Sequence, residues 1–440
     1  CLAPSTIQEA HDIVRDAFAL SEEFSLPVIF RPTTRICHSK GDTVTGDPAH
    51  VKRKGEFQRN PQQYVVIPAH TRVLHRKLNQ KQPLVKRALV EKRYNHAVVR
   101  GSVAVVASGI AASYVQEVLP DSVSFMKIGA YPIDEEWLAA FVQQHEMVLV
   151  VEELHPVVED AVRQVAGCVA VHGKKDGMVP YEGELSTVAV AKIMQACGIA
   201  PSRVFSEPSP AGDVPGRPPI LCAGCMHRPV FYAMRRVFKD GIFPSDIGCY
   251  TLGLQLGAVD TTICMGASVT VASGIAQSGE DRDVVATIGD STFLHTGIPG
   301  LLNAVYNGAK MILVILDNRV TAMTGHQPNP SSGMTACGTP VPPVSLEAIC
   351  RACGVSYVET VDPYDLVSLI SVLKEARERP GVKVIIARQP CVITARRAGM
   401  RRGRYQVDPE TCTACGLCIK FGCPAIEKAG EKAFINDLCS

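Results

Sequence analysis

The stretch Val284-Val-Ala-Thr-Ile-Gly-Asp-Ser291 decides the fold of this chain. It is an apolar run of strand length that ends directly in a turn, Gly289-Asp290-Ser291. A second apolar run, Met311–Leu316, ends in Asp317-Asn318, and residues 297–307 between the two runs have helical spacing. Because a strand, a helix and another strand predict a parallel sheet, Asp290 and Asn318 should meet at the carboxyl ends of neighbouring strands.

This edge of the sheet predicts a cation site. A carboxylate oxygen and a carboxamide oxygen are hard ligands that suit Mg²⁺, and a glycine at position 289 lets the backbone approach a diphosphate closely. For Gly-Asp-Ser alone, an ordinary strand-end turn with a capping Asp remains an alternative.

The same alternation extends over most of the chain. Helix and strand patterns alternate through residues 99–200 and again through 221–400, which predicts an α/β protein with successive open parallel sheets. Residues 5–20 read as a helix, 27–30 as a buried strand and 38–70 as a long polar connection. The proline-rich stretch 201–220 cannot form a regular core element, so we place a domain boundary there.

The composition excludes several classes of protein. The 440 residues are 46% apolar and carry 45 Lys and Arg against 43 Asp and Glu, so no basic excess favours nucleic acid. The apolar runs are too short to span a membrane and no export signal begins the chain, which predicts a cytoplasmic protein. Seventeen cysteines in such a chain favour metal ligation over disulfides.

The C-terminal cysteines have the spacing of an iron–sulfur motif. Two residues separate Cys412 from Cys415 and two separate Cys415 from Cys418. Cys423-Pro424 closes the run, as in loops that wrap a [4Fe–4S] cube. Cys439 lies where a second such motif would begin. A zinc knuckle is the alternative. The pair Cys350-x2-Cys353 lies in a helical pattern and is interpreted as core packing.

The motif around Asp290 resembles a known family. Gly-Asp-Ser followed by Asn318 resembles the signature of thiamine diphosphate enzymes, and the run 318–327 looks like that of 2-oxoacid:ferredoxin oxidoreductases, with His326 and Thr321-Ala322 as departures. The whole chain resembles the alpha subunits of indolepyruvate:ferredoxin oxidoreductases. The supporting segments are residues 31–38, 221–228, 245–253, 264–268, 289–299 and 318–328.

The resemblance implies a domain order and a fold. The implied fold consists of transketolase-like thiamine-enzyme domains with a short α+β ferredoxin-like tail. The implied parts are the end of a pyrimidine-binding domain (1–40), a connecting segment (41–98), a transketolase C-terminal-like domain (99–200), the linker (201–220), a thiamine diphosphate-binding domain (221–400) and a truncated [4Fe–4S] ferredoxin domain (403–440). The activating Glu of the family would precede Cys1, so no catalytic residue is named. We expect a piece of a longer protein, inactive as it stands.

The resemblance also implies the ligands of each cofactor. Asp290, Asn318 and the Val320 carbonyl would hold Mg²⁺, and Cys412, Cys415, Cys418, Cys423 and Cys439 would serve [4Fe–4S] clusters in the tail. The implied contacts with thiamine diphosphate are Gly289, Asp290, Ser291, Asn318, Val320, Thr324, Gly325 and Cys249. Related enzymes bind a cluster beside the thiamine through a cysteine pattern that Cys222, Cys225, Cys249 and Cys391 match. The alternative is that Cys222 and Cys225 only end a loop and that Cys249 packs as a small apolar residue.

The implied reaction is the oxidative decarboxylation of aryl 2-oxo acids to acyl-coenzyme A, with ferredoxin as acceptor and a smaller beta subunit as partner. Arg31, Arg35, His38 and His227 are candidates to contact the substrate carboxylate. Two alternatives remain: a non-oxidative thiamine diphosphate decarboxylase or lyase, and a non-enzymatic iron–sulfur electron carrier.

Overall fold

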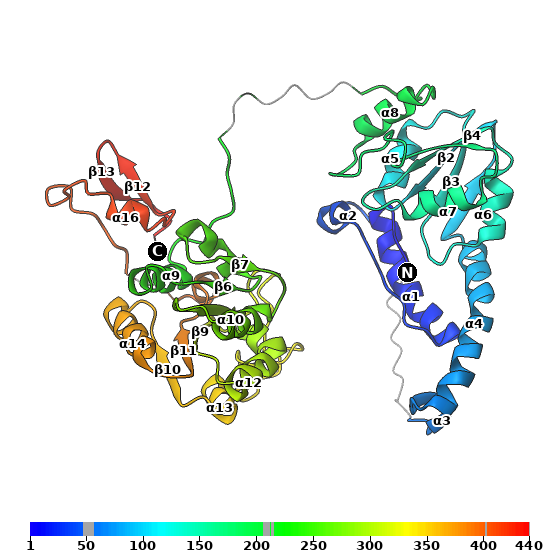
Figure 1. Ribbon diagram of the computed structural model, residues 1–440. Coiled ribbons are helices and arrows are strands. Elements are labelled where there is room, and N and C mark those ends of the chain that lie inside the picture. Colours follow the sequence, from blue (N-terminus) through cyan, green and yellow to red (C-terminus); the bar gives the residue numbers. More distant parts are fainter. Residues whose placement is uncertain (47–56, 206–211, 213–214, 401–402, 440) are drawn as a thin grey trace. The chain divides into compact units, whose positions relative to one another are not determined.

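The structure is a computed structural model that describes residues 1–46, 57–205, 212, 215–400 and 403–439. The chain forms two compact units, Cys1–Val214 and Pro215–Ser440, and the division falls inside the proline-rich stretch 201–220 (Figure 1). Residues 206–211 and 213–214 of that stretch, and 47–56 of the expected connecting segment, lie outside the described residues. The expected domain assignments stay predictions.

The first unit is built on a five-stranded sheet of order β1-β3-β2-β4-β5. Only β1 is antiparallel to its neighbour. The strands are β1 (Asn95–Val98), β2 (Val103–Ser108), β3 (Ser124–Ile128), β4 (Met147–Val151) and β5 (Ala170–His172). The helices are α1 (Ile7–Phe24), α2 (Thr34–His38), α3 (Pro61–Tyr64), α4 (Pro68–Glu91), α5 (Ile110–Val118), α6 (Glu135–Val142), α7 (Val157–Val165) and α8 (Thr187–Ala196).

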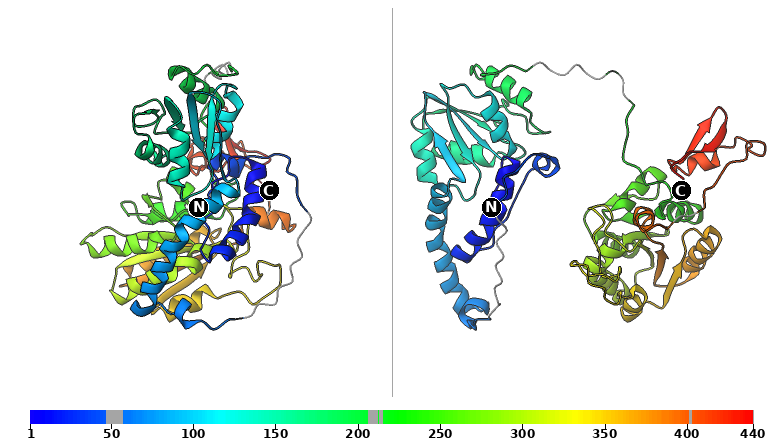
Figure 2. Two further views of the ribbon diagram at one scale, coloured as in Figure 1. Left: turned by 90° about the vertical axis from the view of Figure 1, so that its right-hand side faces the viewer. Right: turned by 180° about the vertical axis from the view of Figure 1, so that it is seen from behind.

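Helices cover both faces of this sheet. One core lies between the sheet and α5 and α8, and a second lies between the sheet and α6 and α7. Because both faces are covered, the strand interiors are continuous apolar runs, as in Val103–Ser108, rather than alternating ones. The long helix α4 extends beyond the sheet (Figure 2).

The N-terminal residues pack on this same sheet. Leu2 bridges to both Phe30 and Ala130, and an apolar cluster joins Leu2 to Ile13 of α1 and Leu89 of α4. The helix predicted over residues 5–20 is α1, but the strand predicted at 27–30 is wrong, because only Phe30 makes a bridge there. The predicted polar connection 38–70 is wrong in part, since α3 and the start of α4 lie within it.

The second unit contains an all-parallel six-stranded sheet of order β10-β11-β9-β8-β6-β7. Its strands are β6 (Pro244–Ser245), β7 (Thr261–Thr262), β8 (Val285–Gly289), β9 (Met311–Asp317), β10 (Tyr357–Val361) and β11 (Val382–Arg388). Its helical elements before the tail are α9 (His227–Val237), η1 (Cys249–Leu256), α10 (Ala267–Gln277), α11 (Asp290–Thr292), η2 (Phe293–Gly297), α12 (Ile298–Tyr306), α13 (Leu346–Ala352), α14 (Leu366–Glu378) and α15 (Val392–Arg397). The tail forms α16 (Leu417–Lys420) and a hairpin of β12 (Ile426–Ala429) and β13 (Lys432–Ile435).

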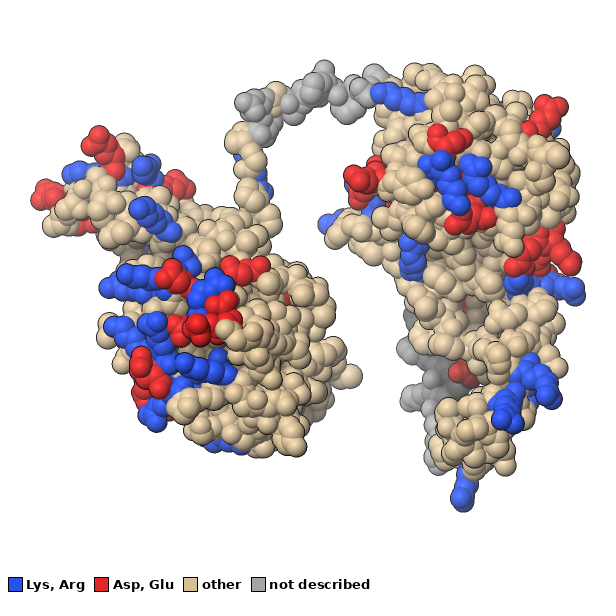
Figure 3. All heavy atoms as spheres, viewed as in Figure 1, with Lys and Arg blue, Asp and Glu red and all other residues tan. Residues whose placement is uncertain are grey.

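This sheet also lies between two helical layers. Helices α9 and α14 pack on one face, and α10, α12 and α13 pack on the other. Strand β9 is buried along its whole length, which explains its unbroken apolar sequence. Figure 3 shows Lys and Arg interleaved with Asp and Glu on the visible face of this unit. Across the described ranges, no helix has an apolar stretch long enough to cross a bilayer.

Candidate active site

The two strand ends predicted to form a cation site lie side by side. Strands β8 and β9 are parallel neighbours, and Gly289 pairs with Leu316 in their register. Asp290 therefore begins α11 at the same edge of the sheet at which Asn318 follows β9. Both side chains are buried, with 2% and 8% of their surfaces exposed. The turns are tied together by a 2.8 Å hydrogen bond from the Thr321 hydroxyl to the Ser291 hydroxyl.

The Asp290 carboxylate has two hydrogen-bond donors that sequence reasoning missed. The Ser331 hydroxyl and the Asn329 amide both donate to its Oδ2, over 2.7 and 3.0 Å. The hydrogen bonds from Ser331 and Asn329 lower the pKa of Asp290. Burial first, and the nearby Asp317 second, outweigh them and raise this pKa to about 6. A cation would stabilise such a buried carboxylate, so the environment of Asp290 fits the predicted Mg²⁺ site.

The other predicted cofactor contacts follow β9. The Asn318 side-chain oxygen accepts from the Val320 amide over 3.1 Å, and Thr324 donates to Gln327 over 2.7 Å in an exposed turn. Gly325 has a φ of 124°, a conformation that favours glycine. These positions stay predictions as diphosphate contacts.

A tyrosine fixes the turn that carries Asp290. A Cβ added at Gly289 would lie 2.7 Å from the Tyr250 ring, and one at Gly248 would lie 2.6 Å from it. The ring therefore packs directly on both backbones, and its hydroxyl donates to the Ile247 carbonyl over 3.1 Å. Glycine is needed at both positions because any side chain would displace Tyr250.

Four cysteines from distant parts of the second unit line one cavity of about 140 Å³ together with Asn318. They are Cys222, Cys225, Cys249 and Cys391. Burial first, and then the charges of the other three thiols, raise the pKa of Cys225 to about 12. However, within the part of the chain that the structure describes, no three His, Cys, Asp or Glu side chains are placed to hold a metal ion. The cluster assignment therefore stays a prediction.

Two histidines line the same cavity. His227 is 1% exposed, its Nδ1 has no hydrogen-bond partner among the described residues, and burial lowers its pKa to about 4. Its ring meets the edge of Tyr250 at 6.0 Å. His326, which departs from the family pattern, has a φ of 65°. The Nδ1 of His227 is thus a buried polar atom on a residue of a cavity whose lining is otherwise mostly apolar.

The remaining substrate candidates lie in the first unit. Arg35 forms an ion pair with Glu184, and Arg31 and His38 are exposed. Arg31, Arg35 and His38 stay predictions as substrate contacts.

The cysteines of the tail are close in sequence and accessible. Cys415 is exposed, and Cys412, Cys418, Cys423 and Cys439 are half-buried. Hydrogen bonds from the backbone amides of Ala433 and Ala414 lower the pKa of Cys412, which favours its thiolate form. As cluster ligands these cysteines stay predictions.

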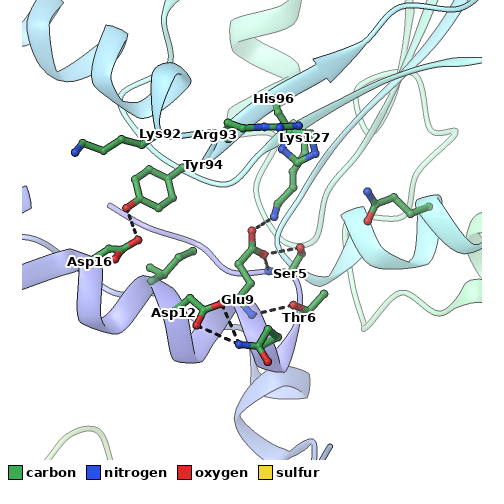
Figure 4. Close-up of a pocket in the computed structure, with 13 residues that line it drawn as sticks. Ser5, Thr6, Glu9, Asp12, Asp16, Lys92, Arg93, Tyr94, His96 and Lys127 are labelled. Atoms are coloured by element: carbon green, nitrogen blue, oxygen red, sulfur yellow. Dashed lines mark hydrogen bonds and ion pairs between the residues drawn. The ribbon is translucent and has the colours of Figure 1, made fainter. Parts of the chain in front are cut away.

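A polar pocket of about 350 Å³ in the first unit has a structural explanation (Figure 4). Glu9 of α1 reaches the ammonium of Lys127 on β3, and its other oxygen accepts from the Ser5 amide and hydroxyl over 2.6 and 2.7 Å. Beside it, the Tyr94 hydroxyl donates to Asp16 over 2.9 Å. These bonds attach α1 to the sheet, so the acidic and basic groups that form them are paired with one another.

Known proteins resemble the chain over nearly all of its length. Residues 246–387 match the family model "Thiamine pyrophosphate enzyme, C-terminal TPP binding domain". Indolepyruvate oxidoreductase subunit IorA of Archaeoglobus fulgidus is 43% identical over 99% of this chain and 73% of its own length. The 2-oxoglutarate synthase subunit KorB of the same organism is 27% identical over 38% of this chain and 68% of its own length. A solved 2-oxoglutarate:ferredoxin oxidoreductase from Magnetococcus marinus covers 41% of this chain and 66% of its own, with 23% identity and a TM-score of 0.36. On the extent and identity of the first relative, the chain belongs to the IorA family of indolepyruvate oxidoreductase subunits.

Proposed function

We propose that the chain works in an enzyme that oxidatively decarboxylates aryl 2-oxo acids to acyl-coenzyme A and passes the electrons through [4Fe–4S] clusters to ferredoxin. Family membership supports the oxidation of a 2-oxo acid. The observation that carries the finer proposal is that Asn318 of the predicted Mg²⁺ site lines one cavity with four cysteines. A non-oxidative enzyme would have no use for thiols at that place.

The residues at the ends of β8 and β9 would hold thiamine diphosphate and Mg²⁺. Asp290, Asn318 and the Val320 carbonyl supply oxygen ligands, and Gly289 and Ser291 lie where the diphosphate would approach. Thr324, Gly325 and Cys249 complete the proposed contacts. When bound, the cofactor supplies an electron sink for the bond that breaks on decarboxylation. The raised pKa of Asp290 supports this assignment, because the buried carboxylate gains most from a cation.

The cavity residues would then carry the electrons away. Cys222, Cys225, Cys249 and Cys391 are proposed to bind one [4Fe–4S] cluster, and the tail cysteines to serve two more with the rest of their motif. The other cavity residues are mostly apolar, including Leu221, Met226 and Leu252. Such a lining excludes water and keeps the dielectric constant low, which strengthens every electrostatic interaction inside.

The partners are proposed on the same basis. The relative is named as a subunit, which supports a second, smaller beta subunit. Ferredoxin, coenzyme A and a cytoplasmic location are proposed with it. Arg31, Arg35, His38 or His227 would meet the substrate carboxylate.

An anaerobic assay of the complete enzyme tests the proposal. Indolepyruvate, phenylpyruvate, pyruvate and 2-oxoglutarate would each be supplied with coenzyme A, and CO₂ and reduced viologen would both be measured. The proposal expects two electrons per CO₂, measured as two one-electron-reduced viologens for each CO₂ released, and the fastest turnover with the aryl substrates. Release of CO₂ without reduced viologen would favour a non-oxidative enzyme. Viologen reduction by an external donor without any CO₂ release would favour an electron carrier.

A further inference from the structure

Within the second unit, the cysteine-rich tail (residues 403–439) packs on the α/β part through the turn after α16. The Phe421 ring meets Tyr232 of α9 edge-on, with ring centroids 5.9 Å apart. A Cβ added at Gly422 would lie 3.3 Å from both Arg228 Nη1 and Leu256 Cδ2, and its φ of 69° favours glycine. The turn therefore lies directly against α9 and the end of η1.

A second contact holds the far end of the tail. Arg396 of α15 donates through Nη2 to the Leu438 carbonyl over 2.9 Å. Helix α9 follows Cys225, η1 begins at Cys249, and α15 follows Cys391. All three segments that bring cysteines to the cavity thus contact the tail.

Arg228 joins the two cysteine groups. Its side chain donates to the Leu221 carbonyl through Nη2 and to the Cys222 carbonyl through Nε over 3.4 Å, while Nη1 lies 3.5 Å from the Phe421 carbonyl. Arg228 is 3% exposed, and burial lowers the pKa of its guanidinium, against which the nearby Cys423, Cys225 and Cys222 act. One buried guanidinium therefore contacts the loop of the first cysteine pair and the turn before Cys423.

We propose that Arg228 is a positioning residue that fixes the tail against the cysteine cavity, so that electrons leave the cavity through the Phe421–Cys423 turn. With the proposed clusters bound, one electron at a time would pass from the cluster of the cavity cysteines, which would be oxidised, to the cluster of the tail cysteines, which would be reduced. The electron path rests on the proposed function, whereas the docking does not.

Hydrogen exchange of the complete enzyme tests the docking without any cofactor signal. Arg228→Met removes the guanidinium from one side of the contact, and Phe421→Ala removes the ring from the other. Both variants should make the amides of residues 417–423 exchange about tenfold faster. Loss of one charged hydrogen bond or one ring contact lowers the free energy of local opening by an amount that corresponds to about this factor. Arg235→Met, on the same helix but bonded to Lys239 within the unit, is the matched control and should change nothing in the tail. Unchanged tail exchange in both variants would overturn the proposal. So would an effect of Arg228→Met confined to residues 221–226.

Electron paramagnetic resonance of the anaerobically purified enzyme then tests the path. In the wild type, reduced centres in the cavity and the tail should broaden one another's signals. Both variants should lose this broadening at unchanged iron content, and Arg235→Met should keep it. Retained broadening in Phe421→Ala would contradict the path. Absence of cavity iron in the wild type would refute the proposed function instead, and the exchange result would still judge the docking.

Discussion

Asp290 is the residue on which the proposed cofactor site depends most. Its carboxylate is buried, and its Oδ2 already accepts two hydrogen bonds from Asn329 and Ser331. Oδ1 has no side-chain donor in the described part of the chain, so it is the oxygen we expect to bind the cation. The two donors would then orient a metal ligand, as second partners of ligands commonly do.

Replacing Asp290 should abolish Mg²⁺-dependent binding of thiamine diphosphate. Asp290→Ala leaves the diphosphate charge under-neutralised, and Ser331→Ala should weaken Mg²⁺ binding by about tenfold because it only loosens the carboxylate. Calorimetric titration of the complete enzyme with Mg²⁺ and cofactor measures both effects. Asp281→Ala, at an exposed loop position, is the control. Unchanged cofactor affinity in Asp290→Ala would refute the assignment.

The ion pair between Glu9 and Lys127 should stabilise the first unit. Burial would raise the pKa of Glu9, but the charge and hydrogen bond of Lys127 hold it below its usual range. Such a carboxyl contributes stability above its unfolded pKa and loses it as the pH falls. Lys127→Met should therefore cost about 3 kcal/mol at pH 7 and less as the pH falls through the lowered pKa of Glu9, where the carboxyl becomes protonated.

The only tryptophan of the sequence, Trp137, lies in α6 and makes this measurable by fluorescence during urea unfolding. Exposed Lys175 pairs with exposed Asp160, so Lys175→Met is a control that should cost much less stability than Lys127→Met. An equal loss of unfolding free energy in the two variants would show that the Glu9–Lys127 pair stabilises the first unit no more than an exposed pair does.

At the level of elements, the long apolar strands were predictable and the short ones were not. Strands β2, β4, β8 and β9 are mostly apolar runs whose signal is local, and β11 is apolar apart from Lys383 and Arg388. Strands β6 and β7 have only two residues each and join the sheet through their neighbours, so no pattern in their own sequence indicates them. The antiparallel pairing of β1 is likewise set by tertiary contacts.

Strand β11 contains a buried lysine whose burial should be destabilising. Burial, and secondarily Lys310, lowers the pKa of Lys383 to about 8. Because its folded pKa lies below the unfolded one, the cost is full below pH 8 and fades as the pH rises toward 10.5. Lys383→Met should stabilise the second unit by about 2 kcal/mol at pH 7 and by less at pH 10. Calorimetric melting at the two pH values measures this, with exposed Lys374→Met as the control. A gain that grows with pH would contradict the reasoning.

Replacing one cysteine of the tail should remove iron from the tail without affecting the thiamine diphosphate site. Cys415→Ser should remove about four irons, because a cubane needs every thiolate of its loop. Binding of thiamine diphosphate should stay intact, since the predicted contacts lie at the ends of β8 and β9. Iron analysis and cofactor titration of anaerobic protein check both statements, and exposed, unclustered Cys337→Ser is the control. Full iron content in Cys415→Ser would refute the tail cluster.

In the whole molecule, the fold brings together residues that the sequence separates widely. Spacing alone predicted that Asp290 and Asn318 meet, since one crossover helix joins their strands. Cys391 could be placed with Cys222, Cys225 and Cys249 only through the family resemblance, and the structure now puts all four in one cavity lining. Asn329, Ser331 and His326 were missed because loop residues that turn back onto a strand end leave no periodic signal.

The most direct test of the central claim is a single anaerobic turnover of the complete enzyme with indolepyruvate, followed by low-temperature electron paramagnetic resonance. The account predicts that substrate alone produces a reduced [4Fe–4S] signal, that coenzyme A increases it, and that Cys391→Ser delays it without preventing cofactor binding. Release of CO₂ and the corresponding aldehyde with the clusters still oxidised would contradict the account.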